Sequence, residues 1–139
     1  MFGSLSAGLA FSNASLGAVH AMAHSLGAVC RIPHGLANSI LLPHVMRYNL
    51  EEIPELTADI AEAMGLATND MDTLSAANAA ADEMEGFAKR IGLDHRLRDL
   101  GVEEESLKDC AELSMSDGSI VYNPKIVMDA DEVLSVYLK

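Results

Sequence analysis

Four of the five histidines lie within 25 residues of one another, and their spacing is the first feature that could support chemistry. His20 and His24 stand four residues apart, so in a helix their side chains share one face. His34 follows fourteen residues after His20, just beyond Pro33, so a helix, a reversal and a second helix can bring His20 and His34 side by side. Imidazole is a common ligand of first-row metals. The spacing is compatible with a metal site, although a helical pair of histidines is weak evidence on its own.

The helix that would carry His20 and His24 lies in an uncharged stretch. Residues 1–30 contain no Asp, Glu, Lys or Arg, and the first formal charge is Arg31. A signal peptide needs a basic region ahead of its apolar run, and a membrane helix would hold fewer serines, asparagines and histidines. We therefore expect no membrane partner, and one long helix over residues 4–26 that is buried on most sides and ends at Gly27.

The rest of the chain predicts shorter helices with short connections. Pro33 is well placed to open the next helix, and Pro43 inside it predicts a kink or a break. The Asp117-Gly118 pair indicates a turn, residues 119–122 are predicted to be extended at most, and no segment alternates like a β-strand. The later predicted helices span residues 34–48, 55–64, 70 or 72 to 91, 103–115 and 129–138. The predicted fold class is all-α, a bundle of about six helices in a single domain, residues 1–139.

The charge balance argues against one class of partner. The chain has 21 acidic and 9 basic residues, and a formal net charge of −12. Binding along a phosphate backbone needs a surface rich in Lys and Arg. We therefore expect no nucleic acid partner.

The two cysteines and the two remaining histidines show no spacing that is typical of metal ligands. Cys30 and Cys110 form no C-x-x-C motif, which argues against a zinc knuckle and against a disulfide framework. Two such thiols suit a reducing compartment, so we expect a cytoplasmic protein in which each is a small buried apolar residue. We interpret His44 and His95 as surface residues or hydrogen-bonded core residues.

The residues around the histidines closely resemble the signature block of the iron-containing (group III) alcohol dehydrogenases. The matching segments are AGLAF at 7–11, LG at 16–17, HAMAHSLG at 20–27, PHG at 33–35 with Asn38, LLP at 41–43 with Asn49, LRDLGV at 97–102 and NPK at 123–125. Together they extend over nearly the whole chain. The resemblance implies the C-terminal, metal-binding domain of a dehydroquinate synthase-like two-domain fold.

The resemblance also implies roles for individual residues. In that family two histidines of this block bind the catalytic metal, usually Fe²⁺ and sometimes Zn²⁺ or another divalent ion, and by position these are His20 and His34. His24 corresponds to a catalytic histidine beside the nicotinamide of NAD or NADP, which handles protons or orients the cofactor. The metal acts as a Lewis acid on small primary alcohols and aldehydes. Phe11 could line the cofactor or substrate pocket, or pack in the core.

These residues do not include the dinucleotide-binding domain of such an enzyme. Family members place a dinucleotide-binding α/β domain before this region, and that domain supplies an Asp and a His as two further ligands. No Asp-x-x-x-His motif is present here. Since catalytic metal sites of this kind use at least three protein ligands, we expect the chain alone to bind metal weakly and to lack dehydrogenase activity. Without that domain, apolar surface around the first helix would be exposed, so we expect the chain to form a homo-oligomer.

Two alternatives compete with this interpretation. The chain could be a fragment of a related glycerol dehydrogenase-like enzyme, although the pairing of HAMAHSLG with PHG fits the alcohol dehydrogenase branch better. It could instead be a non-enzymatic helical remnant kept for assembly or binding. A metal titration tests the second alternative, because the His20→Ala and His34→Ala substitutions weaken metal binding only if the site is functional.

Overall fold

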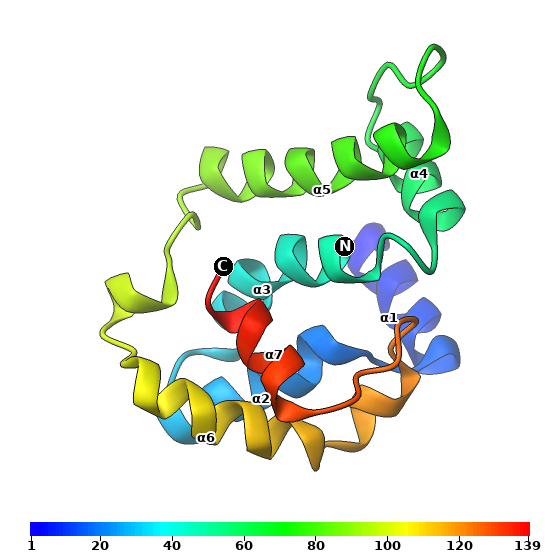
Figure 1. Ribbon diagram of the computed structural model, residues 1–139. Helices are drawn as coiled ribbons and strands as arrows, with labels where there is room; N and C mark the ends of the chain where they lie inside the picture. Colours follow the sequence, from blue (N-terminus) through cyan, green and yellow to red (C-terminus); the bar gives the residue numbers. More distant parts are fainter.

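Every regular element of the computed structural model, which describes residues 1–139, is a helix (Figure 1). The α-helices are α1 (Phe2–Ala14), α2 (Ala18–Cys30), α3 (His34–Asn49), α4 (Pro54–Ala63), α5 (Thr73–Arg90), α6 (Glu104–Met115) and α7 (Ala130–Tyr137). Two short 3₁₀ helices, η1 (Leu97–Leu100) and η2 (Gly118–Tyr122), lie between them. The absence of strands confirms the predicted all-α class. There are seven α-helices rather than about six because the first predicted helix is in fact two.

Helix α2 is the centre of the fold, with contacts to both α3 and α6. In Figure 1, α7 lies close to this group and brings the C-terminus back to it. The main hydrophobic core comes from α2, α3, α6, α7 and the short segments beside them. Its largest fully buried side chains are Met22, Leu26, Leu41, Val45 and Cys110. The helix that carries His20 and His24 is therefore held on several sides.

Helices α4 and α5 form a separate layer against α3, with α5 running above α3 in Figure 1. Small side chains are buried in this layer, because alanine favours helix and lets neighbouring helices approach closely. The buried alanines are Ala61, Ala76, Ala77, Ala80 and Ala81. Asp72 caps α5 by accepting the N–H of Ser75 at 2.9 Å, so the helix follows the later of the two predicted starts, residues 70 and 72.

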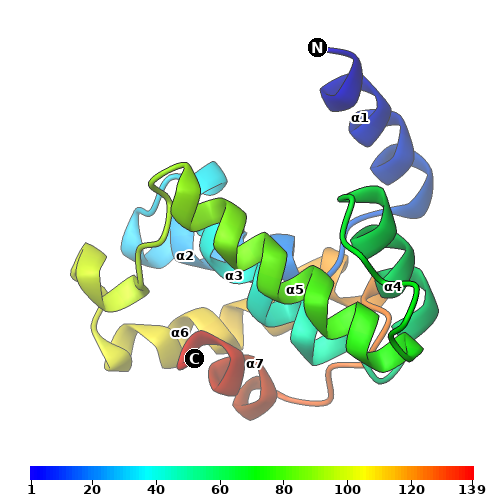
Figure 2. The same cartoon turned by 90° about the horizontal axis from the view of Figure 1, so that it is seen from above.

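The prediction of one buried helix over residues 4–26 is wrong, because the chain breaks between α1 and α2. Ser15 adopts a left-handed φ of 68°, and Gly17 is extended. Helix α1 buries no residue and projects away from the other helices (Figure 2), so the expected burial holds only for α2. The start of α2 depends on Asn123, whose Oδ1 accepts the N–H of Ala18 at 3.2 Å. Neither α1 nor any other helix combines the length and apolar character needed to cross a membrane.

Asn123 and Asn49 form a buried amide pair beneath the first turn of α2. Asn123 Nδ2 donates to Asn49 Oδ1 and to the carbonyl of Lys125, each at 2.7 Å. Asn49 Nδ2 donates to Asn123 Oδ1 at 3.1 Å. Gly17 permits this approach, because a Cβ at that position would lie 3.1 Å from Asn123 Oδ1. The pair joins the start of α2 to the end of α3, which gives the Asn-Pro segment a structural role.

Helix α2 also ends later than predicted. It continues through Gly27 to Cys30, and Arg31 then takes a left-handed φ of 58°. The N–H of Ile32 donates to the carbonyl of Leu26 at 3.3 Å, a bond typical of helix C-termini. Because this ending is tight, only three residues separate α2 from α3.

The break that was one of the two predictions for Pro43, and the extended chain predicted for residues 119–122, are not found. Helix α3 continues through Pro43 without a break, and the buried side chains of Leu41 and Val45 hold both sides of it in the core. Residues 118–122 form η2 rather than extended chain, because Asp117 accepts the N–H of Ser119 at 2.8 Å and starts a turn.

Candidate metal centre

Three histidines from two helices meet across the interface between α2 and α3. One ring nitrogen of each lies within 4.8 Å of those of the other two. The ring centroid of His20 is 6.0 Å from that of His24 and 5.2 Å from that of His34, and the rings of His24 and His34 stack at 5.1 Å. His20 is half-buried, whereas His24 and His34 are exposed. The cluster brings together both predicted ligands and the predicted catalytic histidine.

The local sequence explains this convergence. His20 and His24 are one turn apart on α2, so they project from one face. After the three-residue connection, Pro33 precedes His34, the first residue of α3, and α3 packs back against α2. The reversal therefore places the first turn of α3 beside the face that carries the other two rings.

The surroundings of His20 favour its neutral form, and neutral imidazole is the form that binds metal. Burial lowers the pKa of His20 below its ordinary value of 6.5, and positive charge on His34 or His24 lowers it further, against a smaller opposing effect of Asp117. An ion held about 2.1 Å from each nitrogen needs ligand atoms no more than about 4.2 Å apart, and the upper limit of 4.8 Å between the three nitrogens is close to that separation. The donor set fits a first-row divalent ion such as Fe²⁺ or Zn²⁺.

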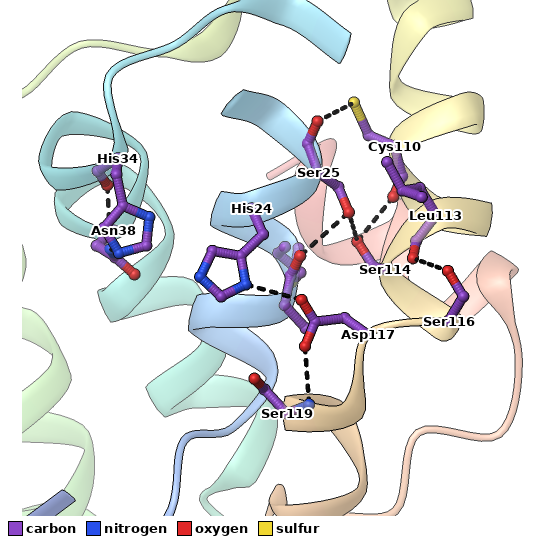
Figure 3. A network of polar contacts seen from close by, with 12 residues as sticks. His24, Ser25, His34, Asn38, Cys110, Leu113, Ser114, Ser116, Asp117 and Ser119 are labelled. Atoms are coloured by element: carbon purple, nitrogen blue, oxygen red, sulfur yellow. Dashed lines mark hydrogen bonds and ion pairs between the residues drawn. The ribbon is translucent and has the colours of Figure 1, made fainter. Parts of the chain in front are cut away.

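Asp117, at the start of η2, holds the ring of His24 (Figure 3). Its Oδ2 lies 2.7 Å from Nδ1 of His24, while its Oδ1 accepts the N–H of Ser119. Burial alone would raise the pKa of Asp117, but the hydrogen bonds from Ser119 and His24 outweigh it, so the pKa is lowered. Because an ionised carboxylate only accepts, Nδ1 of His24 carries a proton and Nε2 is the free basic nitrogen.

Asn38, one turn into α3, contacts His34. Its Nδ2 donates to Nε2 of His34 at 2.8 Å and to the His34 carbonyl at 3.0 Å. Since a carbonyl oxygen only accepts, the amide nitrogen must face His34, and Nε2 of that ring is an acceptor. A metal bound at this Nε2 would displace the amide. Oδ1 of Asn38 is buried without a hydrogen-bond partner.

An apolar cavity of about 510 Å³ adjoins the cluster at His20. Its walls come from α1, α2, α3, α5 and the segments that follow α1 and α5, and include Asn38. The larger apolar residues that line it are Phe11, Leu16, Val19, Leu42, Met84, Phe87 and Ile91. Phe11 thus lies in the cavity wall, outside the main core, and is 50% exposed.

A larger cavity, of about 830 Å³, contains none of the three clustered histidines. It is lined by α3, α5, η1 and the C-terminal segment, and its walls mix acidic and basic side chains. His44 and His95 both line it, and burial lowers the pKa of His44. We place the functional site at the smaller cavity because His20, one of the three clustered histidines, lines it.

Sequence reasoning identified the three histidines but missed two side chains that contact them. Asn38 follows His34 by four residues on a predicted helix, a spacing that indicates contact. Asp117 is 93 residues from His24. Its only local signal is the Asp-Gly pair, which indicates a turn and carries no information about a distant histidine.

Comparison with known proteins agrees with this geometry. The family model for "Fe-containing alcohol dehydrogenase family, C-terminal" matches residues 1–139. The chain belongs to the iron-containing alcohol dehydrogenase family. This confirms the resemblance found in the sequence, and the remaining comparisons show how much of a relative the chain covers.

The relatives within the iron-containing alcohol dehydrogenases are longer than this chain. The 1,3-propanediol dehydrogenase of Citrobacter freundii is 49% identical over 124 residues, which are 89% of this chain and 32% of that protein. The lactaldehyde reductase of Escherichia coli (strain K12) is 43% identical over 119 residues, which are 86% and 31%. A crystal structure of 1,3-propanediol oxidoreductase matches with a TM-score of 0.91 and 45% identity, over 95% of this chain and 34% of that one. The chain spans about a third of the length of these relatives.

Proposed function

We propose that this chain is the metal-binding part of an iron-dependent, NAD(P)-linked alcohol dehydrogenase that interconverts small primary alcohols and aldehydes. The cluster of His20, His24 and His34 carries the proposal, because its ligand atoms lie within 4.8 Å of one another beside an apolar cavity. Membership of the iron-containing alcohol dehydrogenase family supports the metal and the reaction class.

In this proposal His20 and His34 are the metal ligands. The half-buried position of His20 lowers its pKa and so favours the neutral ring, and His34 offers Nε2 once Asn38 releases it. Fe²⁺ is the proposed ion, with Zn²⁺ or another divalent ion as the substitute. When bound, the ion supplies Lewis-acid polarisation of the oxygen of an alcohol or aldehyde.

His24 is proposed to move the proton rather than to bind the metal. Asp117 keeps a proton on Nδ1, so Nε2 can accept the hydroxyl proton of an alcohol and return it in the reverse reaction. The carboxylate also stabilises the imidazolium that forms when Nε2 is protonated. The side chain of His24 is 45% exposed, which allows exchange of the proton with solvent.

The apolar cavity is proposed to receive the carbon chain of the substrate and the edge of the nicotinamide. Its volume of about 510 Å³ is within the usual range of ligand pockets. Phe11 forms one wall, and Asn38 is a polar residue in the lining. The apolar walls favour short, weakly substituted alcohols.

A dinucleotide-binding domain is proposed to complete the enzyme. Residues 1–139 then act as the C-terminal, metal-binding domain, and the partner domain provides the main NAD or NADP site and the remaining metal ligands. Two imidazoles fall short of the three or more protein ligands that such sites use. We therefore expect residues 1–139 alone to show no dehydrogenase activity. The apolar side chains of α1 are proposed to contact the rest of the enzyme or, without it, a second copy of the chain.

A chimera tests the proposed function. This chain is fused to the part of the Citrobacter freundii relative that it does not cover, and the product is loaded anaerobically with Fe²⁺. The assay follows reduction of NAD⁺ and NADP⁺ with ethanol, 1,3-propanediol and glycerol. We expect the chimera to oxidise a small primary alcohol, and expect His20→Ala, His34→Ala and His24→Ala to lose most of that activity. His95→Ala is the matched control, since His95 lies at the other cavity.

The other outcomes separate the alternatives. A chimera that folds and binds NAD⁺ yet turns over no alcohol contradicts the proposal and favours an assembly remnant. A marked preference for glycerol favours the glycerol dehydrogenase-like alternative. Alcohol-dependent NAD⁺ reduction by residues 1–139 alone contradicts the proposed division between two domains.

A further inference from the structure

The two cysteines lie side by side, although they are 80 residues apart in the sequence. Cys30 is the last residue of α2 and Cys110 lies within α6, and their Sγ atoms are 3.8 Å apart. Their spacing in the sequence does not indicate this contact. Since these are the only cysteines of the chain, an intramolecular disulfide could join only this pair.

The two thiols have different surroundings. Cys110 is fully buried, and its Sγ lies 3.7 Å from the carbonyl of Ser25, in position to donate to it (Figure 3). Burial, with the neighbouring Cys30, raises the pKa of the Cys110 thiol to about 12. Cys30 is only partly buried and lies at the helix end, so it is the thiol that a small molecule in solvent can reach.

A metal site does not explain the pair. Thiolate zinc sites use three or four protein ligands. The cluster of three possible ligands in the structure consists of histidines, and neither cysteine belongs to it. The contact therefore consists of two thiols without further ligands, which suits thiol–disulfide chemistry.

We propose that Cys30 and Cys110 form an oxidation site, which a hydroperoxide converts into an intramolecular disulfide between α2 and α6. The thiolate of Cys30 attacks one oxygen of hydrogen peroxide, the O–O bond breaks, and the other oxygen leaves as water once protonated. This step oxidises Cys30 to a sulfenic acid and reduces the peroxide. The sulfur of Cys110 then attacks the sulfur of Cys30, the S–S bond forms, and the S–O bond breaks. The departing hydroxide takes the Cys110 proton as a second water.

The structure allows this second step with little rearrangement. A disulfide bond is about 2.0 Å long, so the two sulfur atoms must approach by about 1.8 Å. This approach would require rotation of the two side chains or a shift of the end of α2. The bond would fix the end of α2, the helix of His20 and His24, to α6.

The test treats the reduced chain of 139 residues with one equivalent of hydrogen peroxide. We expect titratable thiols to fall from two per chain to none, with a loss of about 2 Da in intact mass, the two thiol hydrogens. Peptide mapping without reductant should recover one linked pair of peptides that contains Cys30 and Cys110. A disulfide over a loop of this length should raise the melting temperature by about 10 °C, and reductant should reverse the rise.

Two variants separate the roles of the thiols. Cys110→Ala should stop at the sulfenic acid of Cys30, which a dimedone probe traps. Cys30→Ser, a substitution at a partly exposed position, should leave Cys110 unreactive. Retention of both thiols in the wild-type chain overturns the proposal. Conversion only to disulfide-linked dimers or to sulfinic acid overturns it equally.

Discussion

The carboxylate of Asp117 decides which nitrogen of His24 is free. Its Oδ2 lies 2.7 Å from Nδ1, and the backbone N–H of Ser119 helps to keep it ionised. Without this partner, the two tautomers of the ring would compete, and one of them places the proton on the nitrogen that must accept it. In the proposed function, the contact therefore acts on the proton-handling step rather than on metal binding.

The substitution Asp117→Asn tests that role. The amide of asparagine can donate to Nδ1 of His24, which moves the ring proton to Nε2 and blocks its use as a base. In the chimeric dehydrogenase we expect kcat to fall about 10- to 100-fold with little change in KM or metal content. Asp59→Asn, at an exposed position on α4, is the control. Unchanged kcat in Asp117→Asn contradicts the assigned role.

The lowered pKa of His20 makes the stability of the metal-free chain depend on pH. Burial, with the neighbouring histidines, lowers this pKa below 6.5, so near that pH the folded chain binds fewer protons at His20 than the unfolded chain. The contribution of His20 is complete above pH 6.5 and is lost as pH falls through its folded-state pKa. We expect the urea midpoint, measured with EDTA, to fall as the pH is lowered below 6.5, and His20→Gln to reduce that fall. Equal pH dependence in His20→Gln and in the control His95→Gln contradicts this expectation.

The start of α2 is determined by a contact between distant segments. The amide of Asn123 accepts the N–H of Ala18 and pairs with Asn49, so three parts of the chain meet at one buried group. Gly17 leaves the space for this contact. The same arrangement sets the direction in which His20 and His24 project.

Removal of the Asn123 side chain should therefore weaken the whole fold. The substitution Asn123→Ala leaves the Asn49 amide and the first turn of α2 without a partner in a buried place. We expect the free energy of unfolding in urea to fall by about 2–3 kcal/mol. Asn69→Ala, in the exposed loop before α5, should change it by less than about 0.5 kcal/mol. A loss at Asn123 no larger than at Asn69 would show that the amide pair does not stabilise α2.

Local patterns predicted the helices from α3 onward, because their signals lie within each helix or directly beside it. Pro54, Asp72 and Asp129 mark helix starts in the sequence, and Gly65 follows a helix end with a φ of 80°. The break before α2 and the contact of Asp117 with His24 could not be predicted. Each depends on a hydrogen bond between residues about a hundred positions apart, Ala18 with Asn123 and His24 with Asp117. The three histidines were found because helical spacing and the resemblance to a known signature agree.

The molecule as a whole is a packed set of helices from which α1 projects. No residue of α1 is buried, and this uncharged helix exposes Phe2, Leu5, Leu9 and Phe11. The remaining surface carries the acidic excess of the chain. An apolar helix of this kind should bury its side chains against another surface.

Self-association through α1 is the expected consequence. In sedimentation velocity at high concentration we expect the chain to form dimers or larger species, and Leu5→Glu to return it towards the monomer. Leu56→Glu on α4 is the matched control, because Leu56 is 62% exposed and Leu5 is 60% exposed. A wild-type chain that sediments as a clean monomer contradicts the expectation.

The most direct test of the proposed metal centre is calorimetric titration of the chain with Zn²⁺, and with Fe²⁺ under anaerobic conditions. The proposal predicts binding of one ion per chain, weakened at least about tenfold by either His20→Ala or His34→Ala and unchanged by the control His95→Ala. Equal affinity in all four proteins, or no binding by any of them, would contradict the assignment of His20 and His34 as ligands.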